Sequence, residues 1–396
     1  MKKIGIITGT RAEYGILKEI IDKMNCSNEV ELQLIVTGMH LSPEFGLTYQ
    51  EIEEDGYFIT EKIEMLMSSD TTVGIAKSVG VAMMGFADCF ERLKPDMVLI
   101  LGDRYEMLAA ATAAMIARIP IAHLYGGDLT EGAMDDAIRH SITKMSTLHF
   151  TSTEQYRKRV IQLGEQPEYV YNVGALGVEN VKRQVLLKKE ELEESIQFLL
   201  DKPYAVVTYH PVTLEEKSSE KQFRELLKAL DKLDNYKFIF TKANSDTEGR
   251  IINQLIDEYV KRNMDKAAAF TSLGMIRYLS ALKYCDMVIG NSSSGLIEAP
   301  SFKIPTVNIG NRQKGRERSE AVIDCGNNEN EIWEAMTRAI QLKKGGRLQN
   351  LSNPYEGKDT SLRIYQEILK YLFEDRTAKA FYDIDFDYND GKRQKS

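Results

Sequence analysis

Short apolar runs alternate with longer amphipathic stretches along most of this chain. Short apolar runs bounded by glycine or polar turns predict buried strands, and apolar positions with a helical repeat predict helices. The expected strands cover residues 3–8, 31–37, 97–101, 119–124, 148–151, 205–209, 237–241, 267–271, 287–289 and 306–309. The expected helices cover residues 13–24, 72–93, 105–117, 220–233, 247–261 and 361–373, with another from Asp135. This alternation predicts an α/β fold with parallel sheets and helices on both sheet faces.

The alternating pattern pauses at residues 173–177 and in the charged stretch 182–194, and then starts again. A restart of this kind predicts two domains, and a chain of 396 residues is long enough for both. We therefore expect two doubly wound, Rossmann-like domains at residues 1–175 and 176–374. Residues 375–396 form a polar tail, which either returns to the N-terminal domain or is disordered.

The formal net charge of −8 disfavours a nucleic-acid partner, because a protein that binds nucleic acid needs a basic face. No apolar run approaches the roughly 18 residues of a membrane span. The apolar run at the N-terminus is too short for a signal sequence and ends in a glycine turn. The four cysteines are scattered without metal-binding spacing, which fits a reduced cytoplasm. We therefore expect a cytoplasmic protein with neither a nucleic-acid nor a membrane partner.

The clearest functional signal is residues 290–298, Gly-Asn-Ser-Ser-Ser-Gly-Leu-Ile-Glu. They follow a predicted buried strand, and a short helical stretch begins at Gly295. Small hydroxyl side chains and glycines at such a turn leave backbone N–H groups open to an anion. Glu298 is a poor phosphate ligand because like charges repel, but it suits the paired hydroxyls of a ribose. The segment therefore predicts a site for a nucleotide diphosphate.

Polar residues also follow several other predicted strands. They are Arg11 after the first strand, Asp103 and Arg104 after residues 97–101, His123 within residues 119–124 with Tyr125 and Asp128 beyond it, and His210 after residues 205–209. The carboxyl ends of parallel strands lie at one edge of a sheet, where ligands of α/β proteins bind. Two sheets that both carry such groups at this edge most simply face each other across a cleft.

Each of these residues also has a purely structural interpretation. Arg11 could be an exposed arginine in a tight turn, Asp103 a helix N-cap, and Asp135 a carboxylate that complements a helix dipole. His210 could pack in a turn before Pro211. Their joint placement at strand ends favours the functional interpretation more strongly than any single residue does.

Motifs for common cofactors are missing from the sequence. No Gly-x-Gly-x-x-Gly follows the first strand and there is no Walker motif, which disfavours a dinucleotide cofactor or ATP. No predicted helix carries two histidines at metal-binding spacing, so we expect no metal site.

Taken together, the motifs resemble those of the UDP-N-acetylglucosamine 2-epimerase family, and of its hydrolysing branch, which opens sialic-acid-type biosynthesis. The matching stretches are 9–11 (Gly-Thr-Arg), 102–104 (Gly-Asp-Arg), 126–140, 210–211 (His-Pro), 290–298 and 308–313 (Asn-Ile-Gly-Asn-Arg-Gln). They extend over nearly the whole chain. Arg104, followed by an aromatic and an acidic residue, and the run 135–140 look like the hydrolysing branch.

The resemblance implies a GT-B type fold, in which two Rossmann-like domains face each other across a cleft, and a nucleotide-sugar substrate. The implied substrate-binding residues are Arg11, Ser292 and Ser293 for the diphosphate, Glu298 for the ribose, Arg312 near the phosphates, and Arg104, His123 and Gly295 in the matching motifs. The implied catalytic residues are Asp103, Asp135 and His210.

The implied reaction explains these residue types. The proton on C2 of the sugar is not acidic, because no carbonyl lies beside it, but departure of UDP from C1 builds positive charge that acidifies it. Cations and N–H dipoles stabilise the leaving diphosphate, and a carboxylate or histidine takes the proton. The resulting glycal accepts water, which gives N-acetylmannosamine from UDP-N-acetylglucosamine without a metal or redox cofactor.

One position departs from the family pattern. Many relatives carry a glutamate two residues after the histidine equivalent to His123, where this chain has Tyr125. Either Asp128 or Glu131 substitutes as an acid–base group, or the substrate differs. The related enzymes of legionaminic-acid pathways act on a GDP-linked N-acetylglucosamine or on a UDP-linked 2,4-diacetamido-6-deoxy sugar, and both stay open as alternatives.

Two other classes of function remain open for this fold. A GT-B glycosyltransferase would need an acceptor groove, of which the sequence gives no sign, and a catalytically inactive protein would only bind the nucleotide sugar. We expect a homo-oligomer, either a dimer or a tetramer. The helix at residues 72–93 is rich in small residues and could form its interface or only the core of a domain.

Overall fold

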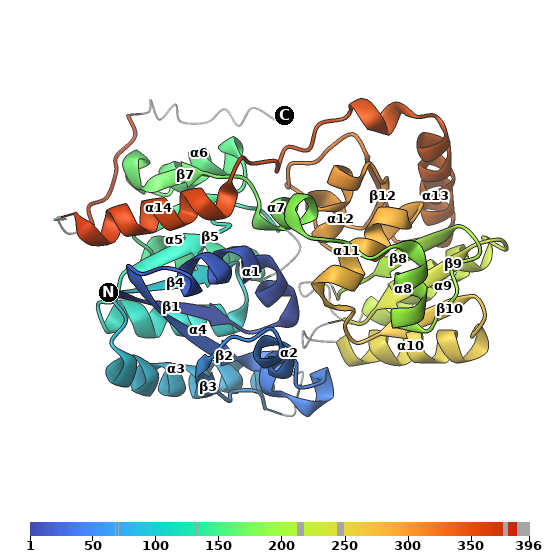
Figure 1. The fold of residues 1–396 in the computed structure, drawn as a ribbon. Helices are drawn as coiled ribbons and strands as arrows, with labels where there is room; N and C mark the ends of the chain where they lie inside the picture. Colours follow the sequence, from blue (N-terminus) through green and yellow to red (C-terminus); the bar gives the residue numbers. More distant parts are fainter. Residues whose placement is uncertain are drawn as a thin grey trace.

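The computed structural model of this protein describes residues 1–67, 69, 71–130, 134–211, 218–243, 249–374 and 379–385. Each half of the chain builds one parallel β-sheet, and the two sheets lie side by side (Figure 1). The first contains β1 (Lys2–Thr8), β2 (Val30–Thr37), β3 (Ile59–Ile63), β4 (Met97–Leu101), β5 (Ile121–Leu124), β6 (Leu148–Thr151) and β7 (Val170–Asn172). The second contains β8 (Tyr204–Thr208), β9 (Lys237–Thr241), β10 (Ala267–Phe270), β11 (Met287–Gly290), β12 (Thr306–Ile309) and β13 (Val322–Cys325). The predicted α/β fold with two Rossmann-like sheets is confirmed.

The strand order of both sheets changes direction in the middle. The first sheet has the order β3-β2-β1-β4-β5-β6-β7 and the second has the order β10-β9-β8-β11-β12-β13. The central pairs β1–β4 and β8–β11 are both parallel. Ligands of such sheets bind beyond the carboxyl ends of the strands at the point where the order reverses. The fold therefore positions the loops after β1, β4, β8 and β11 for a site.

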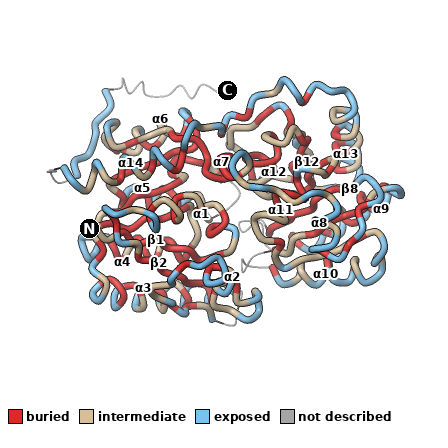
Figure 2. Tube along the Cα trace, in the orientation of Figure 1, coloured by how far each residue is buried: buried red, intermediate tan, exposed pale blue. Residues whose placement is uncertain are grey.

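Helices cover both faces of each sheet, so the buried positions of the chain lie in the interior of each half (Figure 2). On the first sheet, the helices are α1 (Arg11–Asn25) and α14 (Thr360–Phe373) on one face, and α3 (Thr72–Leu93), α4 (Tyr105–Ile116) and α5 (Asp135–Met145) on the other. On the second sheet, they are α9 (Ser219–Asp231), α10 (Gly249–Arg262) and α13 (Glu329–Lys344) on one face, and α8 (Lys189–Ile196) and α11 (Gly274–Tyr284) on the other. Further helices are α2 (Tyr49–Glu54), α6 (Glu154–Gln162), α7 (Leu176–Arg183) and α12 (Ser294–Ile297).

Helix α14 and residues 379–385 return to the first half. Ile364 and Ile368 of α14 are buried in the core that also contains α1. Farther along, Lys379 pairs with the buried carboxylate of Glu165 (Nζ to Oε2, 2.7 Å), and Tyr382 N donates to Gly164 O (2.9 Å). The sequence predicts a C-terminal domain at residues 176–374, and this range includes α14. In the structure, however, the apolar face of α14 covers the first sheet rather than the second.

Among the described helices, α3 is the one long and apolar enough to meet the length and composition criteria of a membrane span. The sequence-based expectation that no apolar run approaches the length of a membrane span refers to unbroken runs. The helix α3 mixes apolar residues with small and polar ones. Helices in protein cores meet the same criteria. In this structure α3 buries Phe86, Cys89 and Phe90 in a core shared with α4.

Candidate active site

A cavity of about 260 Å³ lies between the two halves. The first half lines it with the start of α1 and with Gly177 of α7, and the second half with residues 271–275, 292–294 and others. The predicted site residues that line this cavity are Arg11, His210, Ser292, Ser293 and Glu298. The predicted cleft between facing strand ends is therefore present, and it combines groups that are far apart in the sequence.

The loop after β11 begins in a conformation that requires glycine. Gly290 has a φ of +136°, and a Cβ at this position would collide with the carbonyl oxygen of Thr208 on β8. The next residue, Asn291, joins this loop to the one after β8, because His210 N donates to Asn291 Oδ1 (2.7 Å) and Asn291 Nδ2 donates to His210 O (2.8 Å). These bonds hold the following Ser292 at the cavity, where its hydroxyl can donate to an anionic ligand.

Two predicted residues support this loop from outside the cavity lining. Gly295 packs against β12, where a Cβ would lie 2.7 Å from Thr306 Cγ2. Arg312 Nη1 donates to Asn291 O at 3.0 Å, and Gln313 Nε2 donates to the same oxygen at 2.8 Å. Gly295 therefore allows close packing, while Arg312 fixes the backbone of the loop and adds positive charge beside it.

Arg11 comes from the first half and reaches the second. Thr10 caps α1, since its side chain accepts from Glu13 N (3.3 Å) and Glu13 Oε2 accepts from Thr10 N (3.0 Å). Arg11 pairs with Glu51 (Nε to Oε2, 2.5 Å), and its guanidinium covers Gly274, where a Cβ would collide with it. Burial lowers the pKa of Arg11, with Glu51 opposing, but arginine keeps its charge at neutral pH. A cation of the first half thus stands at the wall formed by the second.

Glu298 is a buried carboxylate at the cavity. Its residue is 7% exposed, and Oε1 lies over Gly177, where a Cβ would collide with it. Within the part of the chain that the structure describes, Oε2 has no hydrogen-bond partner. Burial raises the pKa of Glu298 to about 7, against a hydrogen bond from Ser294. Such an oxygen is available to accept hydrogen bonds from hydroxyl groups of a ligand.

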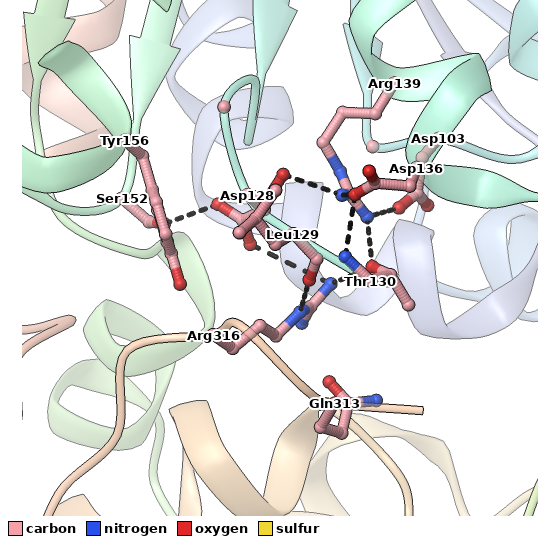
Figure 3. Close-up of polar contacts among 12 residues, drawn as sticks. Asp103, Asp128, Leu129, Thr130, Asp136, Arg139, Ser152, Tyr156, Gln313 and Arg316 are labelled. Carbon is pink, nitrogen blue, oxygen red and sulfur yellow. Dashed lines mark hydrogen bonds and ion pairs between the residues drawn. The ribbon is translucent and has the colours of Figure 1, made fainter. Parts of the chain in front are cut away.

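A second cluster of charges lies beyond the carboxyl ends of β4 and β5 (Figure 3). Its centre is Arg139 of α5, whose side chain is 1% exposed. Nη1 donates to Asp128 O (2.9 Å) and to Asp136 Oδ1 (3.1 Å), and Nη2 donates to Thr130 Oγ1 (2.7 Å) and pairs with Asp103. These partners compensate the cost of burying the guanidinium, and they fix the orientation of the Asp103 carboxylate.

Arg316 reaches this cluster from the second half (Figure 3). Its Nε donates to Leu129 O (2.8 Å), its Nη2 donates to Thr130 Oγ1 (3.3 Å), and the same Nη2 lies 3.9 Å from Asp128 Oδ2. The cluster therefore joins the two halves of the molecule by hydrogen bonds from a buried charge.

The pKa values of two carboxyl groups in this cluster are shifted in opposite directions. Although burial alone would raise it, Arg139 and Arg316 hold the pKa of Asp103 below its ordinary value of 3.8. Burial raises the pKa of Asp128 despite the same arginines, and Ser152 Oγ donates to Asp128 Oδ1 (3.2 Å). Neighbouring carboxyls with opposite shifts are typical of sites that use one as an acid and the other as a base.

The remaining predicted residues are not among those that line the cavity. Arg104 Nε donates to Glu106 Oε1 (2.6 Å) at the start of α4. His123 is fully buried, and burial lowers its pKa to about 3, so a neutral ring contacts Gly102 O through Nε2 (2.8 Å). Asp135 begins α5, next to Asp136 of the charge cluster. The predicted Glu131 lies outside the described residues.

Arg139, Arg316 and Gln313 are not among the candidate site residues predicted from the sequence. Arg139 lies within the matching stretch 126–140, and in the structure it is buried in α5 together with Ile142 and Thr143. Gln313 ended a matching stretch, and Arg316 lies one residue beyond Gly315 in the same loop. No local sequence pattern indicates that Arg316 contacts the other half of the molecule.

Two Rossmann-like halves enclose a cavity lined by hydroxyls and cations, and a charge cluster with paired carboxyls lies outside the lining of this cavity and also joins the halves. These features define a GT-B type protein with a site suited to a nucleotide-linked sugar. The sequence profile of the UDP-N-acetylglucosamine 2-epimerase family matches residues 22–369. The chain belongs to this family and is an enzyme of its hydrolysing nucleotide-sugar 2-epimerase class.

The chain is 49% identical to the GDP/UDP-N,N'-diacetylbacillosamine 2-epimerase (hydrolyzing) of Campylobacter jejuni, over 82% of this chain and 84% of that protein. It is 42% identical to the polysialic acid biosynthesis protein P7 of Escherichia coli, over 97% and 98% of the two chains. The crystal structure of the Neisseria meningitidis UDP-GlcNAc 2-epimerase bound to UDP-GlcNAc has a TM-score of 0.77 with 19% identity, over 93% of this chain and all of that one. At this identity the structural likeness supports the GT-B type fold.

Proposed function

We propose that this enzyme hydrolyses a UDP- or GDP-linked 2,4-diacetamido-6-deoxy sugar with inversion at C2, and so releases the nucleoside diphosphate and the free 2-epimer. The observation that carries this proposal is the 49% identity to the Campylobacter enzyme, whose name states such a substrate. The reaction supplies a sugar for a surface polysaccharide, and we place it in the cytoplasm, where nucleotide sugars are made.

The second candidate substrate is UDP-N-acetylglucosamine, which would give N-acetylmannosamine for sialic-acid-type biosynthesis. The 42% identity to the P7 protein of polysialic acid biosynthesis supports this candidate. The two substrates differ at C4 and C6 of the sugar and share the chemistry at C1 and C2, so the same catalytic groups serve both.

The proposed reaction divides between the two parts of the site. As the C1–O bond breaks, its electron pair leaves with the diphosphate, and Arg11 and the Ser292 and Ser293 hydroxyls stabilise the developing charge. A base takes the C2 proton, which leaves a glycal. Water then adds its hydroxide at C1 and a proton is delivered to C2, so that substrate and water balance against diphosphate and free sugar.

Inversion at C2 requires proton removal from one face of the sugar and delivery to the other. We assign these steps to carboxyls of the charge cluster and to a group on the opposite side. Asp103 is held ionised by arginines and Asp128 is held towards its protonated form by burial. His210 lines the cavity from the second half. Asp135 and the predicted Glu131 stay candidates for the same steps.

The test is a substrate panel without acceptor, in deuterated water. Purified enzyme is incubated with the UDP- and GDP-linked diacetamido sugars and with UDP-N-acetylglucosamine, and release of nucleoside diphosphate is followed beside deuterium at C2 of the free sugar. We expect the highest kcat/KM for a diacetamido sugar. A higher value for UDP-N-acetylglucosamine would establish the second candidate, and intact sugar nucleotides throughout would contradict both. Light scattering of the same sample tests the proposed homo-oligomer.

A further inference from the structure

Tyr125 occupies an unusual backbone conformation at the end of β5. Its φ is +65°, in the left-handed region that is unfavourable for a side chain of this size. The backbone is nevertheless fixed there, since Tyr125 N donates to Phe150 O (2.9 Å) and so continues the pairing of β5 with β6. A strained aromatic residue at a strand end needs a compensating contact.

The compensating contact is at the start of α7. The Tyr125 hydroxyl accepts a hydrogen bond from Gly177 N at 3.3 Å, across 52 positions of sequence. The N-cap residue of this helix, Ala175, has no side-chain cap bond and, as an alanine, cannot make one. Tyr125 therefore supplies a capping oxygen from another part of the fold. Its ring packs against a buried cluster that contains residues of both halves, namely Tyr156, Ala175, Val178, Ile297 and Tyr355.

Gly177 is the residue over which Glu298 lies. A side chain at this position would collide with Glu298 Oε1, so the carboxylate of the second half reaches the cavity only because α7 presents a glycine there. Glu298 and Gly177 both line the cavity, whereas Tyr125 does not, and among the described residues Glu298 Oε2 has no hydrogen-bond partner. Tyr125 therefore contacts Gly177, and Gly177 in turn contacts Glu298.

The Tyr125 hydroxyl also retains a proton to donate. A phenol has one donor, and the bond from Gly177 uses only an acceptor lone pair. Burial and the charge of Glu298 raise the pKa of Tyr125, so the phenol stays protonated and the carboxylate is within electrostatic reach.

We propose that Tyr125 is a positioning residue for nucleotide binding, whose hydroxyl fixes the start of α7 and thereby the Glu298 carboxylate that receives the ribose hydroxyls. The inference deepens the proposed function, because it takes Glu298 as a ligand of the nucleotide. It also gives Tyr125 a function other than acid–base catalysis. Tyr125 does not replace a missing acid–base group but acts through a carboxylate of the other half.

The experiment is a double-mutant cycle of Tyr125→Phe and Glu298→Gln, with UDP and GDP binding measured by calorimetry. We expect Tyr125→Phe to weaken binding of the preferred nucleotide about tenfold, the loss expected for one hydrogen bond that positions a charged group. In the Glu298→Gln background the same change should cost less than about twofold, because its target is gone. Equal losses in both backgrounds, or unchanged affinity, would overturn the proposal.

Kinetics separate positioning from catalysis. We expect Tyr125→Phe to raise KM with kcat nearly unchanged, whereas a fall in kcat at constant nucleotide affinity would assign Tyr125 to the chemistry and refute the proposal. Tyr57→Phe is the matched control, since it removes another phenol hydroxyl of the first half, one that bonds to Asp22. Binding of UDP and GDP does not depend on which sugar the enzyme uses, so the cycle remains decisive if the proposed substrate is wrong.

A second variant covers the case in which Tyr125→Phe does not fold. Gly177→Ala places a methyl group against Glu298 Oε1, and the three atoms nearest to this methyl group all belong to Glu298. We expect this variant to lose nucleotide affinity about tenfold or more. Wild-type affinity in Gly177→Ala would show that the Glu298 position does not matter and would overturn the inference.

Discussion

Replacement of Arg139 tests whether the charge cluster depends on one buried guanidinium. Its donors reach Asp128 O, Thr130 Oγ1 and Asp136, and it pairs with Asp103. Arg139→Met keeps a long apolar chain but leaves two carboxylates without their cation. Removal of one partner of a buried ion pair costs about 3–5 kcal/mol. Because the carboxylate side chains are 22% and 26% exposed, we expect the lower end, about 3 kcal/mol.

The pH dependence of this loss separates charge from packing. In the native protein the arginines hold the pKa of Asp103 below its ordinary value of 3.8. A carboxyl with a lowered native pKa contributes stability above its unfolded pKa, and the contribution is lost as pH falls through the lower native value. The difference in unfolding free energy between wild type and Arg139→Met should therefore be largest at pH 7 and shrink towards pH 3.

The assay is urea unfolding of both proteins across this pH range, beside Arg139→Lys and Arg224→Met. Arg139→Lys keeps the positive charge but loses the planar guanidinium group with its several N–H donors. We therefore expect this variant to recover about half of the stability that Arg139→Met loses. Arg224 forms an exposed pair with Glu220 within α9, and its replacement should cost less than about 0.5 kcal/mol. An equal loss for Arg139→Met at pH 7 and at pH 3 would refute the electrostatic argument and leave only lost packing.

Two further predictions concern the cavity. Gly274→Ala should weaken UDP binding, because its Cβ would collide with the Arg11 guanidinium, whereas Gly46→Ala, with a similar φ of +87° and no atom within 4 Å, should match its backbone strain without affecting binding by calorimetry. Glu298→Gln should stabilise the protein increasingly as pH rises from 4.5 to 7, by up to roughly 3 kcal/mol, because burial raises the pKa of this carboxyl to about 7 and its ionisation costs stability. A gain in melting temperature that is the same at both pH values would contradict the second prediction.

The sheets could be predicted because their central strands are apolar on both faces. The strands β4 and β11, for example, are buried at every position. The strands β3, β7 and β13 did not stand out, since they lie at sheet edges and carry polar residues, as in Ile-Thr-Glu-Lys-Ile of β3. The alternating pattern also identified α14 as a helix, but an amphipathic face does not specify which of two cores it covers.

The site could be predicted where its residues follow strands directly. Ser292 and His210 are of this kind, because parallel topology alone brings the ends of β8 and β11 together. Arg316 and Tyr125 could not be assigned in this way. The contact of Arg316 with Leu129 O depends on how the two halves are placed against each other, and the contact of Tyr125 with Gly177 N joins residues 52 positions apart. A local sequence pattern contains no information about that placement.

The residues that cross between the halves also decide how a ligand acts on the molecule. Arg11 reaches the wall at Gly274, and Arg316 donates to the carbonyl of Leu129, so each half depends on the other for a cation. A ligand that contacts both walls binds only this arrangement, and it therefore stabilises the arrangement in proportion to its affinity. The same arrangement brings Arg316 to the charge cluster, whose other members all belong to the first half. In the proposed function, nucleotide binding at Ser292 and acid–base chemistry at Asp103 thus share one requirement, the relative position of the two halves, although they use different side chains.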